Sequence, residues 1–264
     1  MIIKRITAVT LAATVVFAMV SPARIQASAK KKSNTGTTKN LVVVLDPGHD
    51  LMHHGCQYMG VDEANVNLCL AMLCKQELEK YKGVTVYLTR SGIECPYGSD
   101  PNSTSACLSG RVNLAKAVKA NVIVSLHNDY DADGDVTVNG SKVIIQNANY
   151  RPALWSVDMN LATSILSELT KVGLNINNWK LCPNGTGIVT RNSATTTYPD
   201  GSPSDYYAIL NKAKSANIPA VIIEHAYLSN DSDRINFLSN PANLQAIAAA
   251  DARAIASSFG LSMR

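Results

Sequence analysis

Two histidines and two glutamates stand at the ends of apolar segments, at positions from which they could form a metal centre. His49 follows the run LVVVLDPG, His127 ends the run NVIVSLH, and Glu224 lies near the end of AVIIEH. Glu63 begins a helical pattern soon after the first of these runs. Imidazole nitrogens and carboxylate oxygens are ligands of catalytic zinc, which keeps one position open for water. These residue types therefore predict a metal-dependent hydrolytic site.

We assign His49, Glu63 and His127 as the metal ligands and Glu224 as the general base. Three protein ligands leave the fourth tetrahedral position to water, whose pKa the metal can lower to about 7. A carboxylate that does not bind the metal can then take a proton and later return it. The expected cofactor is one Zn²⁺ per chain.

Each of these residues also has a structural interpretation. A histidine at a strand end can serve simply as a hydrogen-bonding partner, and Glu63 can favour a helix N-terminus through the helix dipole. Glu224 is different, because a carboxylate after the apolar run AVII is poorly hydrated and needs a partner or a function. Spacing alone leaves both interpretations open.

Three further histidines compete as ligands. His53 and His54 fall in a polar loop, where we expect them to be solvated. His225 directly follows Glu224, so in a strand its side chain would point to the opposite face. None of the three is assigned to the metal.

Strand-like and helix-like patterns alternate from residue 41 onward. Strands are predicted at residues 41–46, 84–90, 121–127, 142–147 and 220–225, and helices at 63–81, 108–120, 154–171, 205–215 and 241–258. Several strands are continuously apolar, as expected of strands covered on both faces. The order predicts a single three-layer α/β domain, with a mostly parallel twisted sheet of about six strands and helices on both faces. In such sheets, ligands bind beyond the carboxyl ends of the strands.

Two segments rich in polar residues and glycine, 128–140 and 175–204, are predicted to be loops. The first contains DADGD, which is similar to part of a calcium-binding loop. It lacks the flanking helices and the glutamate at the twelfth position that such a loop requires. We therefore do not expect calcium there.

The first 29 residues have a basic start, a 15-residue apolar run and a small-residue end, which is the order of a secretory signal peptide. A membrane anchor is the alternative, but the run is short for a bilayer-spanning helix, which needs about 20 residues. Residues 30–40 are predicted to be a flexible basic linker and 41–264 the catalytic domain. We expect a secreted monomer, associated with the cell wall and without stable membrane insertion after signal cleavage.

The net charge limits the classes of partner that the chain is expected to bind. The formal net charge is +4, but residues 1–39 hold seven basic side chains, so residues 40–264 carry −3. This balance gives no support for nucleic-acid binding.

Cys95 and Cys107 flank a loop and are the pair we expect to form a disulfide in an exported protein. Cys69 and Cys74 are expected on a helix as small buried residues.

The segments LVVVLDPGHD, EANVNLCLAMLCKQEL, VYLTR, LSGRVNLAKAVKANVIVSLHND and IPAVIIEHAYLSND follow one another in this order. Together they resemble the zinc-dependent N-acetylmuramoyl-L-alanine amidases, specifically the catalytic domain of the amidase type 3 family. The resemblance covers residues 41–258. It departs from the family pattern after the first histidine, where Asp50 and Leu51 replace two glycines, and in the segment SLHND, where the common form is SIHAN. Nothing in segment 175–204 aligns with the family.

The resemblance implies hydrolysis of the amide between N-acetylmuramic acid and L-alanine in peptidoglycan, whose muramic acid and stem peptide would be the substrate. It places His49, Glu63 and His127 at the ligand positions and Glu224 at the catalytic carboxylate. Arg90 and Arg111 could contact a peptide carboxylate or make structural ion pairs.

Two other functions stay open, a zinc peptidase cutting within the stem peptide and an inactive peptidoglycan-binding module. No cofactor motif of the GxGxxG or P-loop kind is present, and no GxSxG elbow supports a serine hydrolase.

Overall fold

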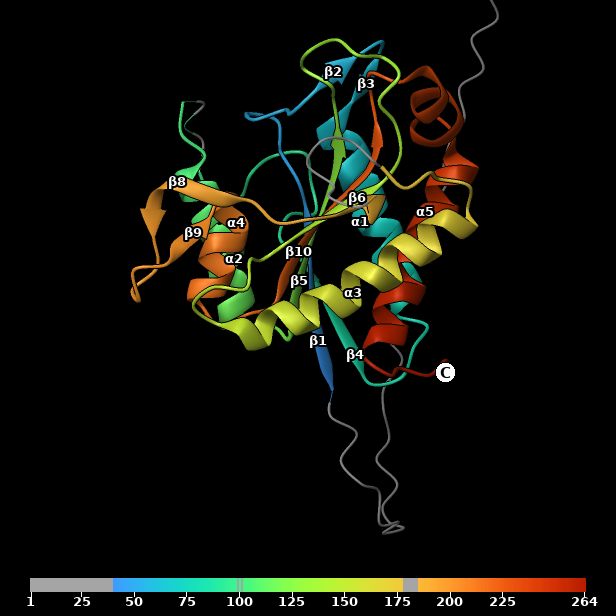
Figure 1. Ribbon diagram of the computed structural model, residues 1–264. Coiled ribbons are helices and arrows are strands. Elements are labelled where there is room, and N and C mark those ends of the chain that lie inside the picture. The colour runs from blue at the N-terminus through green and yellow to red at the C-terminus, as the bar shows by residue number, and fades with distance from the viewer. Residues whose placement is uncertain (1–39, 99, 101, 178–184) are drawn as a thin grey trace, which may run out of the picture. The chain divides into compact units, whose positions relative to one another are not determined.

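The computed structural model describes residues 40–98, 100, 102–177 and 185–264 (Figure 1). Its main sheet has six strands in the order β4-β1-β5-β10-β6-β7. These strands are β1 (Leu41–Pro47), β4 (Val84–Leu88), β5 (Val122–Asp129), β6 (Lys142–Ile145), β7 (Ile188–Val189) and β10 (Ala220–Tyr227). The first four in the sheet order run parallel, while β6 runs antiparallel to β10 and parallel to β7. The predicted mostly parallel sheet of six strands is confirmed.

Helices cover both faces of this sheet, as predicted for a three-layer domain (Figure 1). One face carries α1 (Glu63–Leu78), α3 (Pro152–Lys171) and α5 (Pro241–Ser258), and the other carries α2 (Ser105–Ala117) and α4 (Ala208–Ser215). Strand side chains alternate between the two layers. Val43 and Leu45 belong to the apolar cluster beneath the first face, whereas Val44 belongs to the cluster beneath α2 and α4. Burial on both sides explains why these strands are continuously apolar.

Several predicted boundaries differ from the structure by a few residues. The first helix ends at Leu78 instead of residue 81, and Gly83 then takes a left-handed φ of +67° in the turn before β4. β4 ends at Leu88 because the next two residues bond to the end of β1. Thr89 donates to Asp46, and Arg90 donates to the Pro47 carbonyl. The second helix starts at Ser105, three residues earlier than predicted. The end of β4 thus depends on contacts between residues far apart in the sequence, which periodicity does not encode.

The prediction of one long loop over residues 175–204 is wrong. This segment contains β7, and β8 (Asn192–Thr197) pairs with β9 (Pro203–Asp205) in a separate two-stranded sheet. A second hairpin, β2 (Gln57–Tyr58) with β3 (Val61–Asp62), and a π-helix, η2 (Asp233–Leu238), were also missed. These strands are short or polar, so they lack the apolar alternation by which a strand is recognised.

The predicted disulfide between Cys95 and Cys107 is present. Cys74 is buried in α1 as expected, but Cys69 is exposed, which contradicts the expectation that it is buried. The proposed signal sequence, the linker up to residue 39 and Cys182 lie outside the described residues. Within the part of the chain that the structure describes, no helix is both long and apolar enough to cross a membrane.

Candidate metal centre

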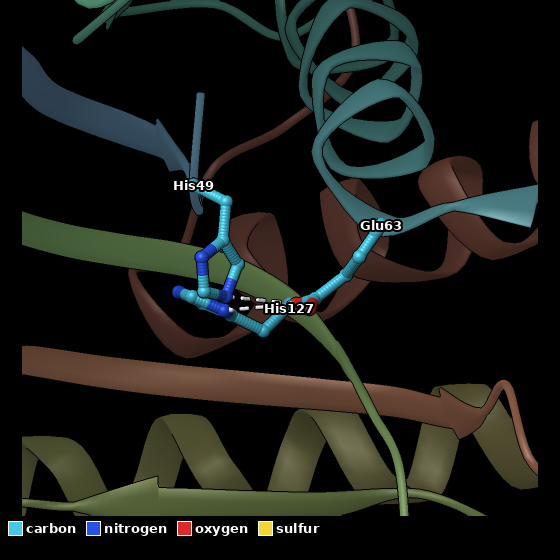
Figure 2. A group of neighbouring side chains, drawn as sticks. All are labelled: His49, Glu63 and His127. Atoms are coloured by element: carbon cyan, nitrogen blue, oxygen red, sulfur yellow. Dashed lines mark hydrogen bonds and ion pairs between the residues drawn. The ribbon is translucent and has the colours of Figure 1, made fainter. Parts of the chain in front are cut away.

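His49, Glu63 and His127 point toward one another at the carboxyl ends of β1 and β5 (Figure 2). Glu63 is the first residue of α1, which begins above the same edge of the sheet. Its Oε1 atom lies 3.3 Å from His49 Nε2 and 3.2 Å from His127 Nδ1. One ligand atom from each side chain falls within 4.8 Å of the other two. The three side chains that were predicted to meet therefore do so.

The turn that presents His49 is strained and fixed by buried arginines. His49 has a φ of +62°, in the left-handed region that a residue with a Cβ rarely adopts. Arg90 donates to the Pro47, Gly48 and Ala64 carbonyls, so it links this turn to the start of α1. Strain of this kind persists only where the surroundings hold the backbone in place.

Arg111 holds the same turn from α2. It donates to Asp46 Oδ1 at 2.8 Å, and to the carbonyls of Pro47 and His49. Burial would raise the pKa of the Asp46 carboxyl, but Arg111 and hydrogen bonds from Ser125 and Thr89 outweigh it and lower that pKa. Arg90 and Arg111 are both buried in such contacts, so the structure favours the structural alternative for both over contact with a peptide carboxylate.

A hydrogen bond selects the nitrogen that His49 offers to a metal. Its Nδ1 lies 3.1 Å from the His53 carbonyl oxygen, which can only accept a proton. Nδ1 therefore carries the hydrogen, and the lone pair of Nε2 faces Glu63. Metal-binding histidines are commonly oriented in this way.

Glu63 is buried and held by several donors. The Cys56 amide donates to its Oε2 at 3.0 Å, and the Asn128 amide and the Asn67 side chain each donate to its Oε1 at 3.2 Å. Burial alone would raise the pKa of this carboxyl, but hydrogen bonds with His127 and His49 outweigh it and hold that pKa well below its usual range. A buried anion facing two imidazoles is suited to a divalent cation.

Asn67 and Asn128 were missed by the sequence reasoning. Asn67 lies one helical turn after Glu63, and its side chain also bonds the Gly48 carbonyl and accepts from Asn128 at 2.9 Å. The i, i+4 spacing of a glutamate and an asparagine on one helix face was the signal that could have identified Asn67. Both asparagines are buried and support the first ligand shell.

Two glycines leave the space that the three side chains occupy. A Cβ on Gly48 would lie 2.2 Å from His127 Nε2, and a Cβ on Gly55 would lie 2.2 Å from Glu63 Oε2. Gly55 also has a φ of +72°, which favours glycine. The ligands thus pack directly against backbone that carries no side chain.

Glu224 lies beside His127, because these two residues are register partners in the parallel pair β10 and β5. Lys142 is its partner on β6. Burial, reinforced by the charge of Asp129, raises the pKa of the Glu224 carboxyl to about 8, while the charge of His127 opposes this effect. A carboxyl of this kind can exchange a proton near neutral pH.

Lys142 itself contacts Asp129 and donates to the Tyr227 hydroxyl at 2.9 Å. The carboxylate predicted as the base therefore lies next to one predicted ligand, His127, and among charged groups.

The competing histidines make other contacts. His225 points away from the site, as predicted, and bonds Asp251 of α5 and the His127 carbonyl at 2.9 Å each. His53 bonds Asp50, and His54 bonds Asp62. The His53 side chain is only 12% exposed, so the expectation that it is solvated is wrong, whereas the His54 side chain is 40% exposed, as expected. The Asp50 carboxylate beside His53 accounts for the difference.

The donor set fits zinc on the evidence of the side chains present. Two imidazoles and one carboxylate converge, the His49 tautomer and the Glu63 carboxylate are held by neighbouring groups, and glycines keep the space around the three side chains free. This is the ligand composition of catalytic zinc sites that keep a position open. On one flank, a cavity of about 160 Å³ is bordered by His49, His127, Leu108 and Ile209.

Comparisons with known proteins identify the family and the fold. Residues 43–257 match the family Amidase_3, described as N-acetylmuramoyl-L-alanine amidase. The chain is similar to a Haemophilus influenzae protein described as the probable N-acetylmuramoyl-L-alanine amidase AmiB, with 26% identity over 215 residues. That alignment covers 73% of this chain and 46% of the relative, so the chain spans about half the length of the curated relative that it matches.

Solved structures share the fold. The CwlD amidase of Clostridioides difficile, determined in complex with the GerS lipoprotein, superposes with a TM-score of 0.64 at 22% identity, covering 84% of this chain and 99% of that one. The Ami1 amidase of Mycobacterium smegmatis gives a TM-score of 0.63 at 20% identity, covering 85% and 99%. These likenesses concern the α/β fold.

Proposed function

The chain belongs to the N-acetylmuramoyl-L-alanine amidase family, and from this premise we propose that it hydrolyses the amide between N-acetylmuramic acid and L-alanine in peptidoglycan. The observation that carries the proposal is the convergence of His49, Glu63 and His127, with Glu224 beside them in register with His127. A set of two imidazoles, a ligating carboxylate and a second carboxylate is what metal-assisted amide hydrolysis requires.

His49, Glu63 and His127 would hold one zinc ion per chain. When bound, zinc supplies Lewis-acid chemistry, polarising a carbonyl and lowering the pKa of water to about 7. The buried hydrogen bonds to Glu63 and to His49 Nδ1 keep these ligands in place before substrate arrives. The chain thereby avoids reorganising its own groups during the reaction.

Glu224 is the general base and then the general acid in this proposal. Its carboxylate takes a proton from the water that attacks the amide carbonyl, and passes it to the L-alanine nitrogen as the C–N bond breaks. Acid–base help of this kind is typically worth about 100- to 10,000-fold in rate. The second product is a stem peptide with a free N-terminal L-alanine.

The same proposal includes how the chain is processed and where it acts. Residues 1–29 would be removed as a signal peptide, and 30–40 would link the catalytic domain, 41–264, to the new N-terminus. The mature protein would act outside the cytoplasm as a cell-wall-associated monomer on the muramic acid and stem peptide, without nucleic-acid partners or stable membrane insertion.

Digestion of purified peptidoglycan tests the proposed bond specificity. We expect zinc-loaded protein to release new N-terminal L-alanine, identified by labelling free amines and analysing the products by mass spectrometry. New amines at other stem residues would instead indicate a peptidase. Peptidoglycan binding without any new amine would indicate a binding module and would contradict the proposal.

A further inference from the structure

An arginine and two tyrosines form an exposed cluster that the proposed mechanism does not use. The Arg191 guanidinium carbon lies 3.6 Å from the centre of the Tyr206 ring. The Tyr206 amide donates to the Arg191 carbonyl at 2.8 Å, and the Tyr206 and Tyr207 rings meet edge to face at 5.2 Å. Stacking holds the guanidinium in one place, while Arg191 and Tyr206 both stay exposed. We call these three residues the arginine–tyrosine cluster.

Arg191 comes from the segment that was predicted to be a loop, whereas Tyr206 and Tyr207 fall at the start of the helix predicted over 205–215, which begins only at Ala208. Arg191 follows β7 and precedes β8, and the tyrosines follow β9, directly before α4. The pairing of Asn192 with Asp205 brings these two chain segments together. In Figure 1, the β8–β9 hairpin and α4 lie on the same side of the sheet as α2.

Strand alternation puts Glu224 on that side of the sheet. Ile222 belongs to the apolar cluster beneath α2 and α4, so Glu224, two residues later on β10, points to the same layer. Ile209 belongs to this cluster too, and it borders the cavity that His49 and His127 also line. Tyr207 lies two residues before Ile209, at the N-terminus of α4. Tyr207, and with it the arginine–tyrosine cluster, therefore lies on the side of the sheet to which Glu224 points, two residues from one that borders this cavity.

Tyr207 interacts electrostatically with both Arg191 and Glu224. Burial raises the pKa of the Tyr207 hydroxyl, and the charge of Glu224 raises it further, while a hydrogen bond with Arg191 acts in the opposite direction. The Tyr207 hydroxyl thus lies within hydrogen-bonding distance of Arg191, and it is close enough to the proposed base, Glu224, to be affected by its charge. None of the ion pairs found among the described residues involves Arg191.

We infer that Arg191, together with the Tyr207 hydroxyl, binds a carboxylate of the stem peptide and makes the enzyme selective for peptides that carry it. A guanidinium can pair with a carboxylate through two parallel hydrogen bonds. Because stacking on Tyr206 already restricts Arg191, less conformational freedom is lost on binding. The inference rests on the proposed function. In that substrate, the lactyl carboxyl of muramic acid is consumed in the scissile amide, so the remaining carboxylates belong to the peptide.

Two soluble substrates test the inference. One is an N-acetylmuramoyl-L-alanyl peptide with free carboxylates, and the other is the same compound with those carboxyls converted to carboxamides. For zinc-loaded wild type, we expect a lower KM for the carboxylate compound. Arg191→Gln should raise that KM about 10- to 100-fold and leave the KM for the carboxamide, kcat and zinc content nearly unchanged.

Further variants separate charge from geometry. Arg191→Lys keeps the charge but not the planar fork, so it should restore only part of the selectivity. Tyr207→Phe should raise the KM for the carboxylate compound less than Arg191→Gln does. Arg253→Gln is the matched control, because this exposed arginine of α5 pairs with Glu168 on the other face of the sheet. Its selectivity should equal that of wild type.

Calorimetry separates failure of this inference from failure of the proposed reaction. Binding of both compounds is measured with the zinc-loaded Glu224→Ala protein, with and without Arg191→Gln. A carboxylate preference that disappears with Arg191→Gln supports the inference even if wild type hydrolyses neither compound, which would contradict the proposed reaction alone. An unchanged preference in Arg191→Gln, or an equal loss for both compounds, would overturn the inference.

Discussion

Single residues decide whether the metal centre can form, and the glycines are as important as the ligands. The Glu63 carboxylate passes within van der Waals distance of the Gly55 backbone, at a place where any side chain would overlap it. Gly60 offers a comparison in the same region, because it also has a positive φ, +81°, but a Cβ there would meet nothing within 4 Å. The two positions therefore separate backbone strain from contact with a ligand.

We expect Gly55→Ala to weaken zinc binding by about 10- to 100-fold, as changes around ligands typically do. The new Cβ would displace Glu63 Oε2 and press on the His49 ring, 2.6 Å from its Cδ2. Competition with a fluorescent chelator measures the affinity. Gly60→Ala should share the strain but keep the wild-type affinity. Equal affinities in both variants would show that the close contact at Gly55 does not matter.

At the scale of elements, α3 carries a buried carboxyl with an unusual environment. Asp158 is fully buried. Burial raises its pKa to about 8, and hydrogen bonds from the Ala220 and Gln146 amides, together with the charge of Lys214, offset only part of this effect. A pKa raised on folding means that the native state binds more protons than the unfolded state. Stability is therefore retained at low pH and decreases as pH rises from about 4 through 8.

Asp158→Asn should stabilise the chain at pH 8, because the amide stays neutral where the carboxyl must ionise. We expect a gain of about 1–3 kcal/mol in the free energy of unfolding, shrinking toward pH 5. Urea denaturation across this pH range measures it. Glu168→Gln, a change at a half-buried position on the same helix, should show no such gain, since ion pairs with Lys171 and Arg253 hold that carboxyl's pKa low. A pH-independent difference for Asp158→Asn would refute the raised pKa.

The disulfide joins the loop after β4 to α2, which supplies Arg111 to the turn at His49. Its cysteines are separated by 12 residues, and closing a loop of about this length stabilises a fold by about 3 kcal/mol in the chain-entropy model. The Cys95→Ala/Cys107→Ala variant should lose about this much stability in urea denaturation. Wild type measured with reductant should match the variant. A variant as stable as oxidised wild type would contradict this contribution.

Sequence reasoning worked best where chemistry and periodicity agreed. Continuous apolar strands indicated a sheet covered on both faces, and the ends of those strands placed His49 and His127 at one edge. It failed where tertiary contacts decide the conformation. The β8–β9 hairpin is Thr-rich and exposed, with no apolar alternation, so Arg191 and Tyr207 could not be placed beside the site. The role of Gly55 depends on Glu63, which reaches it only in the folded chain.

For the whole molecule, metal binding should couple to stability. A metal that binds the native state alone stabilises it by about 2.7 kcal/mol when its free concentration is one hundred times the Kd. We expect chelation to abolish hydrolysis and lower the melting temperature, and zinc to restore both. Magnesium should restore neither, because it prefers oxygen ligands. Full activity and an unchanged melting temperature after exhaustive chelation would contradict a zinc centre.

The ligands are proposed to bind the metal, and Glu224 is proposed to transfer the proton. These separate roles are tested most directly by measuring bound zinc and peptidoglycan hydrolysis together in two purified variants. His127→Ala should lose both the metal and the activity. Glu224→Ala should keep about one zinc per chain and lose the release of N-terminal L-alanine. Hydrolysis at the wild-type rate by Glu224→Ala, or full zinc content in His127→Ala, would contradict the account.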